Sequence, residues 1–170
     1  LVLLQDSWFQ LLIAAALGVI FTQFAFLGHE ASHRQVLASG KTNDHFGRIL
    51  ATFFVGMSYA WWMNKHTRHH GNPNKVGKDP DIEPGALAYR DEDVADRGRI
   101  ASWFTRRQGW FFFPLLLLAG IELHRGSIMD LLTRRGVSGR ALEITLIAVR
   151  TVLYLGLLFW LLPFGMAWAI

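Results

Sequence analysis

Two long apolar stretches, residues 8–28 and 141–162, dominate the pattern of hydrophobic and polar positions along the chain. About 20 residues of helix, rising about 1.5 Å per residue, cross the hydrocarbon core of a membrane, which is about 30 Å thick. Each stretch is long enough, so we expect two membrane-spanning helices. The second contains Glu143 near its start and Arg150 in its interior. A charge is costly inside the hydrocarbon, so we expect Arg150 to face protein or to extend toward the membrane surface.

Two shorter apolar segments, about 46–64 and 103–124, suit helices that lie in the interface or re-enter the membrane. Gly56 and Ser58 interrupt the first. The second has basic residues on both flanks, and the preference of basic loops for the cytoplasm puts both flanks on one side. Between these segments, residues 71–102 are polar and contain Pro73, Pro80 and Pro84. Because proline breaks helices, we expect a cytoplasmic loop with short helices there.

Composition narrows the class of protein further. The 170 residues include no cysteine, are 52% hydrophobic and carry a formal charge of +4. These values exclude disulfide frameworks, thiolate-ligated metal sites and intrinsic disorder, and they favour a membrane over nucleic acid as the partner of the basic residues. The fold class is therefore all-α, with integral membrane helices. The chain begins with Leu1 and ends in an apolar run, so we expect one partial domain over 1–170, truncated at both ends.

Five of the seven histidines form two tight clusters. The first cluster is His29 and His33, and the second is His66, His69 and His70. Residues three and four apart share one face of a helix, so each cluster presents its imidazoles in one direction. Imidazole is a common metal ligand, and a site rich in imidazole without thiolate suits iron, zinc, copper or nickel. The spacing predicts a metal site that both clusters share.

Two other interpretations remain open. The segment from His29 through Glu30 to His33 matches the HExxH pattern of zinc proteases, in which the glutamate is the general base. A zinc protease needs a third ligand but gives no role to the second histidine cluster, so the second cluster argues against it. A membrane scaffold without catalytic function predicts no metal and no effect of changing any histidine. His45 and His124 are isolated and fit a surface turn and an interfacial position.

The order and spacing of the two clusters resemble the histidine boxes of the integral membrane fatty acid desaturases. The likeness extends to bacterial acyl-CoA or acyl-lipid desaturases in the run from Gly56 to Trp62, in Asn72-Pro73-Asn74 and in Asp79-Pro80-Asp81. The resemblance covers most of the chain. It does not separate desaturases from membrane hydroxylases and ketolases of the same superfamily. A third histidine box of the family is missing from this chain, which implies a fragment that is inactive by itself.

The resemblance implies a non-haem centre of two iron ions that uses O2 and two electrons to insert a cis double bond into an acyl chain. The electrons would come from ferredoxin, or from cytochrome b5 with its reductase, at the cytoplasmic side. The substrate would be a fatty acyl-CoA or an acyl-lipid taken from among the membrane lipids. The implied iron ligands are His29, His33, His66, His69 and His70, and no further catalytic group is assigned.

Six other residues are candidates for roles around these ligands. Glu30, Asp79 and Asp81 are carboxylates that would orient a ligand imidazole, and the two aspartates would alternatively contact a polar headgroup. Arg68 faces away from the histidines on a helix and would meet a phosphate. Tyr59 and Trp62 would line an acyl channel, although aromatic residues at this spacing also form interfacial belts.

Overall fold

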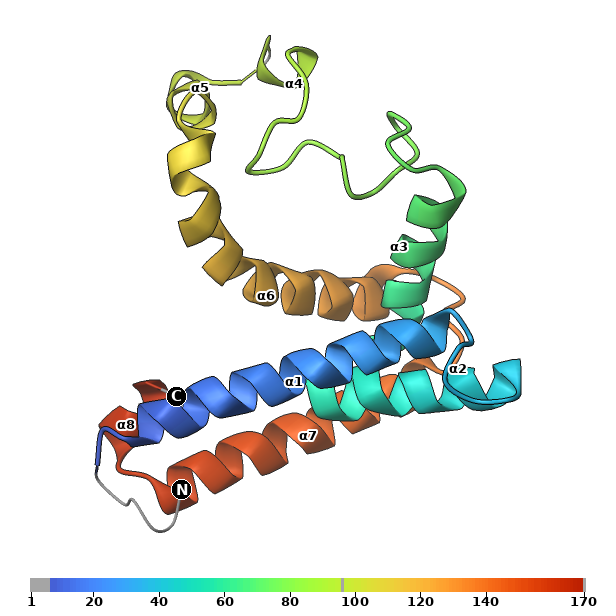
Figure 1. Cartoon of the computed structure of the whole chain (residues 1–170), viewed down its shortest axis with the longest axis vertical. Helices are drawn as coiled ribbons and strands as arrows, with labels where there is room; N and C mark the ends of the chain where they lie inside the picture. The colour runs from blue at the N-terminus through green and yellow to red at the C-terminus, as the bar shows by residue number, and fades with distance from the viewer. Residues whose placement is uncertain (1–6, 96, 170) are drawn as a thin grey trace. The chain divides into compact units, whose positions relative to one another are not determined.

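The computed structural model describes residues 7–95 and 97–169, which are mostly helical apart from the loop before α4 (Figure 1). No strand occurs in this part of the chain, which confirms the expected all-α class. The elements are α1 (Gln10–Ser32), α2 (Gly40–Ile49), the π-helix η1 (Leu50–Val55), α3 (Tyr59–Gly71), α4 (Glu92–Ala95), α5 (Arg99–Thr105), α6 (Gln108–Thr133), α7 (Arg140–Leu161) and α8 (Phe164–Ala169).

The chain divides into two compact units. The first consists of Leu1–Trp61 and Ser127–Ile170, and the second of Trp62–Gly126. In the first unit, α1 packs against α2 and η1, and α7 packs against η1, so these helices lie side by side (Figure 1). Aromatic contacts join α1 to its neighbours: Phe24 lies 4.7 Å from Phe54, and Phe21 lies 6.4 Å from Tyr154, between ring centroids.

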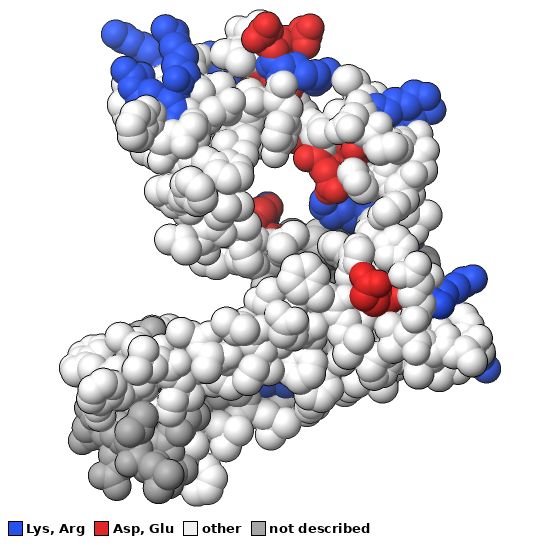
Figure 2. Space-filling model, viewed as in Figure 1, with Lys and Arg blue, Asp and Glu red and all other residues white. Residues whose placement is uncertain are grey.

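Three helices, α1, α6 and α7, are long and apolar enough to cross a membrane. Their large hydrophobic side chains are mostly exposed, among them Leu12, Val19, Val152 and Trp160. Figure 2 shows the length of α1 as uncharged surface, with charged residues only toward its C-terminal end. An apolar surface of this extent suits contact with lipid rather than with water.

A break occurs where one helix was expected over 46–64. Here α2 continues into η1, the chain turns at Gly56 with a φ of 90°, and α3 begins at Tyr59. Glycine is favoured at such a φ because it has no Cβ. The amides of Gly56 and Met57 both donate to the carbonyl of Ala51. The Arg150 guanidinium packs against Gly56 and lies over the rings of Phe21 and Tyr154, so Arg150 faces protein, as expected.

The expected interfacial helix over 103–124 also differs in the structure, because α5 ends at Thr105 and α6 continues to Thr133. Charged side chains do not end α6, since they pair along its surface. Arg125 contacts Glu122 at 2.7 Å within α6, and Arg134, the residue that follows α6, contacts Asp130 of its last turn at 2.9 Å. Such i,i+3 and i,i+4 pairs support a helix. This extension makes α6 long and apolar enough to be a third candidate span, and its interfacial or re-entrant placement stays a prediction.

Arg97 organises the polar loop of the second unit. Its guanidinium donates to the carbonyls of Gly85, Ala86 and Leu87 and to the hydroxyl of Thr105. The loop is therefore held by one arginine against the end of α5.

Close contact between α2 and α3 generates a stability prediction. A Cβ at Gly47 would lie 2.8 Å from Cε2 of Tyr59, whose ring is buried and whose hydroxyl donates to Asp44. Burial and the neighbouring Asp44 carboxylate raise the pKa of Tyr59 to about 12. We expect Gly47→Ala to lower the free energy of unfolding by about 1–3 kcal/mol, because the ring has no space to move. Thermal unfolding in detergent measures the loss.

Gly18→Ala is the matched control, since nothing lies within 4 Å of a Cβ at that position in α1. Alanine is the better helix former, so this variant keeps or gains stability. Equal losses in the two variants would contradict the packing described for Gly47 and Tyr59.

Candidate metal centre

The first histidine pair lies at the C-terminal end of α1. His29 is in the last turn of the helix and His33 is its C-cap, with the two rings edge to face and 4.7 Å between centroids. Both side chains are half-buried. Nδ1 of His29 lies 3.2 Å from Oε1 of Glu30, which is the contact expected of a carboxylate that orients this imidazole. The helix ends directly after the pair, where Arg34 adopts a φ of 60°.

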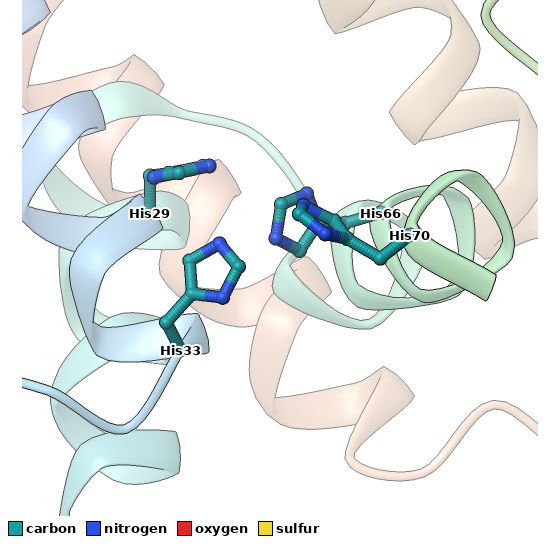
Figure 3. A group of neighbouring side chains, drawn as sticks. All are labelled: His29, His33, His66 and His70. Atoms are coloured by element: carbon teal, nitrogen blue, oxygen red, sulfur yellow. The ribbon is translucent and has the colours of Figure 1, made fainter. Parts of the chain in front are cut away.

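The second pair lies one turn apart on α3. The rings of His66 and His70 have their centroids 4.4 Å apart, and His66 is buried. Trp62 stacks on His66 at 5.0 Å with an interplanar angle of 19°. Trp62 therefore supports the ring of His66 from the preceding turn of the helix. Figure 3 draws the four side chains of the two pairs, His29 and His33 from the end of α1, and His66 and His70 from α3.

His69, the remaining member of the second cluster, contacts two carboxylates of the following loop. Its Nδ1 lies 3.0 Å from Oδ1 of Asp79 and 3.2 Å from Oδ2 of Asp81. These three residues form a group whose ligand atoms could hold a cation. The sequence predicted His69 with the other imidazoles, whereas in the structure its ligand atom groups with the carboxylates of Asp79 and Asp81. The role of these two aspartates around a metal ligand stays a prediction.

Asp79 is fully buried, and several hydrogen bonds to its carboxylate hold this loop. It accepts the backbone amides of Asn74 at 2.7 Å and Asp81 at 2.9 Å, besides the contact with His69. Burial by itself raises the pKa of a carboxyl, but the hydrogen bonds from His69 and Asn74 outweigh it and hold the pKa of Asp79 below its ordinary value. The carboxylate is therefore ionised and suited to accept a proton-bearing Nδ1 of His69.

Two further ion pairs connect α3 to the same loop. Lys65 contacts Asp81, and Arg68 lies 3.4 Å from Glu83. Burial lowers the pKa of Lys65, against the opposing effect of nearby carboxylates. Arg68 contacts the Glu83 carboxylate of the loop, and its contact with a phosphate stays a prediction.

Other candidate residues lie outside the clusters. Tyr59 is buried against Gly47 and donates a hydrogen bond to Asp44, so it packs α2 against α3. A place for Tyr59 in an acyl channel stays a prediction. His45 is exposed and His124 is half-buried, and both belong to neither histidine pair; Nδ1 of His124 lies 2.7 Å from the carbonyl oxygen of Gly120.

The donor set fits a transition metal such as iron. Imidazole nitrogen suits iron, zinc, copper and nickel, and no thiolate competes because the chain has no cysteine. Carboxylates contact Nδ1 of His29 and of His69, and such contacts would fix an imidazole in one orientation and tautomer if it bound a metal. The chemistry of the site therefore agrees with a non-haem metal centre.

Comparison with known proteins decides the family. The family model described as fatty acid desaturase matches residues 6–170. This chain belongs to the fatty acid desaturase family. Among curated relatives, it is 28% identical to a Delta(8)-fatty-acid desaturase of Helianthus annuus, over 81% of this chain and 32% of the relative. It is 29% identical to an acyl-lipid (9-3)-desaturase of Borago officinalis, over 75% of this chain and 31% of the relative.

Other relatives are named for another lipid class. The chain is 27% identical to a Delta 8-(E)-sphingolipid desaturase of Komagataella phaffii, over 78% of this chain and 27% of the relative. The chain thus spans about a third of the length of the curated relatives that it matches. No solved structure matches it significantly. Membership of this family supports an oxidoreductase of lipid metabolism and argues against the zinc protease.

Sequence reasoning missed one buried residue beside this region. Glu143 appeared only as a charge near the start of a membrane span, yet it is fully buried and bonded to residues just before and within α3. A signal was available in the sequence, because an acidic residue in an apolar span needs a partner. The identity of the partner was not readable from local spacing.

Replacing Asp79 tests whether its carboxylate orients a metal ligand. Asp79→Asn keeps the shape but weakens the acceptor at Nδ1 of His69, so we expect the metal affinity to fall roughly 10- to 100-fold. Metal retained by the purified protein against increasing chelator measures the change. Asp91→Asn, at an exposed position, is the control and should retain metal like the wild type. Equal retention in the Asp79 variant would rule out the orienting role.

Proposed function

We propose that this chain is part of a membrane fatty acid desaturase in which the two histidine boxes together bind a centre of two iron ions. The reaction inserts a cis double bond into an acyl chain, with O2 and two electrons. The observation that carries the proposal is the presence of two imidazole pairs, each one helical turn apart, in a chain that belongs to the desaturase family. The family supplies the reaction, and the paired imidazoles supply ligands for its metal.

The ligands we assign to the iron are His29, His33, His66, His69 and His70. Bound iron supplies the redox chemistry that breaks an aliphatic C–H bond, which acid–base side chains do not break. The protein orients these ligands. Asp79 accepts a hydrogen bond from Nδ1 of His69, which leaves Nε2 as the ligand atom, and Glu30 acts on His29 in the same way.

An apolar groove supports the acyl chain as the substrate. It lies within the second unit, has a volume of about 620 Å³, and runs along α6. Its apolar lining includes Leu87, Phe112, Leu115 and Ala119, and Asp81 is one of its polar lining residues. Asp81 also contacts His69, so the groove adjoins the residues around a proposed ligand. A hydrocarbon chain gains by burial against such side chains.

The remaining parts of the proposal follow the family. The acyl group is carried as acyl-CoA or acyl-lipid, and names of relatives include an acyl-lipid and a sphingolipid desaturase. The electrons come from ferredoxin, or from cytochrome b5 and its reductase. We place the metal site at the cytoplasmic surface, because the basic residues at 106–107, 125, 134–135 and 140 favour that side for the loops.

Fatty-acid profiling tests the proposed reaction. The protein that carries this chain, at its natural full length, is expressed in a host with a suitable reductase, and lipids are analysed by gas chromatography. We expect new unsaturated acyl chains from the wild type and none from His70→Ala, which removes a ligand. His45→Ala, at an exposed position away from the clusters, keeps the product.

Three results would contradict the proposal. Hydroxylated products in place of unsaturated ones would show that the protein is a hydroxylase of the same superfamily. Unsaturated chains that persist in His70→Ala would remove His70 from the ligand set. Peptide hydrolysis by the wild type, lost in Glu30→Gln, would reinstate the zinc protease.

Filling the groove tests the acyl-binding surface separately. Ala119→Trp places a large ring among the lining residues, so we expect conversion of long acyl chains to fall roughly tenfold while bound iron is unchanged. Ile121→Trp is the control, because Ile121 is exposed and outside the lining. Conversion is measured in the same lipid profiles. Equal conversion by the Ala119 variant and the control would exclude the groove as the substrate site.

A further inference from the structure

Glu143 is a fully buried carboxylate in the first turn of α7. Its Oε2 accepts the hydroxyl of Ser58 at 2.6 Å, and its Oε1 accepts the backbone amide of Ala60 at 3.2 Å. Nε of Arg48, from α2, approaches Oε1 to 3.1 Å as an ion pair without hydrogen-bond alignment. One carboxylate therefore joins α2, α7 and the beginning of α3 inside the first unit.

These contacts provide hydrogen-bond acceptors for backbone amides at the beginning of α3. The first amides of a helix have no partner within it, and burial without a partner is costly. Ser58 accepts the amide of Trp61 at 3.1 Å, which makes it a side-chain cap, while Glu143 accepts the amide of Ala60. The amide of Ser58 itself donates to the hydroxyl of Ser127 at 3.3 Å. The start of α3 is thus fixed by side chains from distant parts of the sequence.

The chemistry favours a carboxylate at this point. The N-terminus of a helix carries partial positive charge, so an anion is stabilising there. Desolvation of Glu143 is offset by Arg48 and by two hydrogen-bond donors, which is the condition under which a buried charge is tolerated. An apolar residue of the same size would fill the space but would leave the Ala60 amide and the Ser58 hydroxyl without this acceptor.

The start of α3 determines the direction of its histidines. α3 is continuous from Tyr59 to Gly71, and His66 lies six residues, or about 9 Å, beyond Ala60. Each residue turns the helix by about 100°, so a start displaced by one residue would turn the whole box away from its metal. We propose that Glu143 is a positioning residue for the second histidine box, acting by capping α3 through Ala60 and Ser58. The link to the metal rests on the proposed function.

Three variants of the full-length protein separate an acceptor role from a packing role. Glu143→Met fills the same volume without an acceptor, and Glu143→Gln keeps one carbonyl oxygen. Ser58→Ala leaves Glu143 in place but removes the hydroxyl that accepts the Trp61 amide. Two quantities are measured: amide hydrogen exchange over 59–71 in metal-free protein, and iron retained against chelator. Glu92→Met, at an exposed position on α4, is the matched control.

We expect exchange in the first turns of α3 to rise roughly tenfold in Glu143→Met, with iron retention falling by a similar factor. Glu143→Gln shows smaller changes in exchange and in iron retention than Glu143→Met, because its side-chain oxygen can accept the Ala60 amide. Ser58→Ala shows a smaller loss, and the control behaves as the wild type. If Glu143→Met has unfolded globally, with exchange raised equally in α1 and α7, the comparison of Ser58→Ala with the wild type decides the role of the cap.

Two outcomes overturn the inference. Glu143→Met with wild-type exchange in α3 and wild-type iron retention shows that only packing matters at this position. Unchanged exchange in α3 for Ser58→Ala excludes the cap. A wild-type protein that binds no iron contradicts the proposed function instead, and the exchange measurement on metal-free protein still decides whether Glu143 fixes α3.

Discussion

The helical repeat is the constraint on which the site depends. Imidazoles four residues apart stand on one face, and the ring centroids are 4.7 Å apart on α1 and 4.4 Å apart on α3. Two such rings do not complete the ligand shell of a metal, so a complete shell needs further ligands from outside each pair. The orientation of each helix about its own axis is therefore as important as the identity of the histidines.

Two buried carboxylates restrain α3 at its opposite ends. Glu143 accepts the amide of Ala60 at the beginning, and Asp79 holds His69 near the end. Each also accepts backbone or hydroxyl donors, so neither is an isolated buried charge. Helix propensity alone does not fix where a helix begins or how it is turned. These contacts do so, and they explain why a chain rich in apolar residues contains fully buried acids.

Local patterns predicted much of the fold, and all five residues that we propose as ligands come from the histidine spacing in the sequence. The spans expected at 8–28 and 141–162 correspond to α1 and α7, and the histidine spacing predicted both pairs. Length and hydropathy did not predict the turn at Gly56 or the extension of α6, which depend on backbone conformation and side-chain pairing. The bond from Ser58 to Glu143 joins residues 85 positions apart, and no local periodicity contains that information.

The identity of the bound metal tests the central claim most directly. The full-length protein, purified from the membrane without added metal, is analysed for iron, zinc, copper and nickel against protein concentration. The account predicts iron, close to two ions per chain, with the other metals at trace level. One zinc ion per chain, or no metal in active and folded protein, would contradict it.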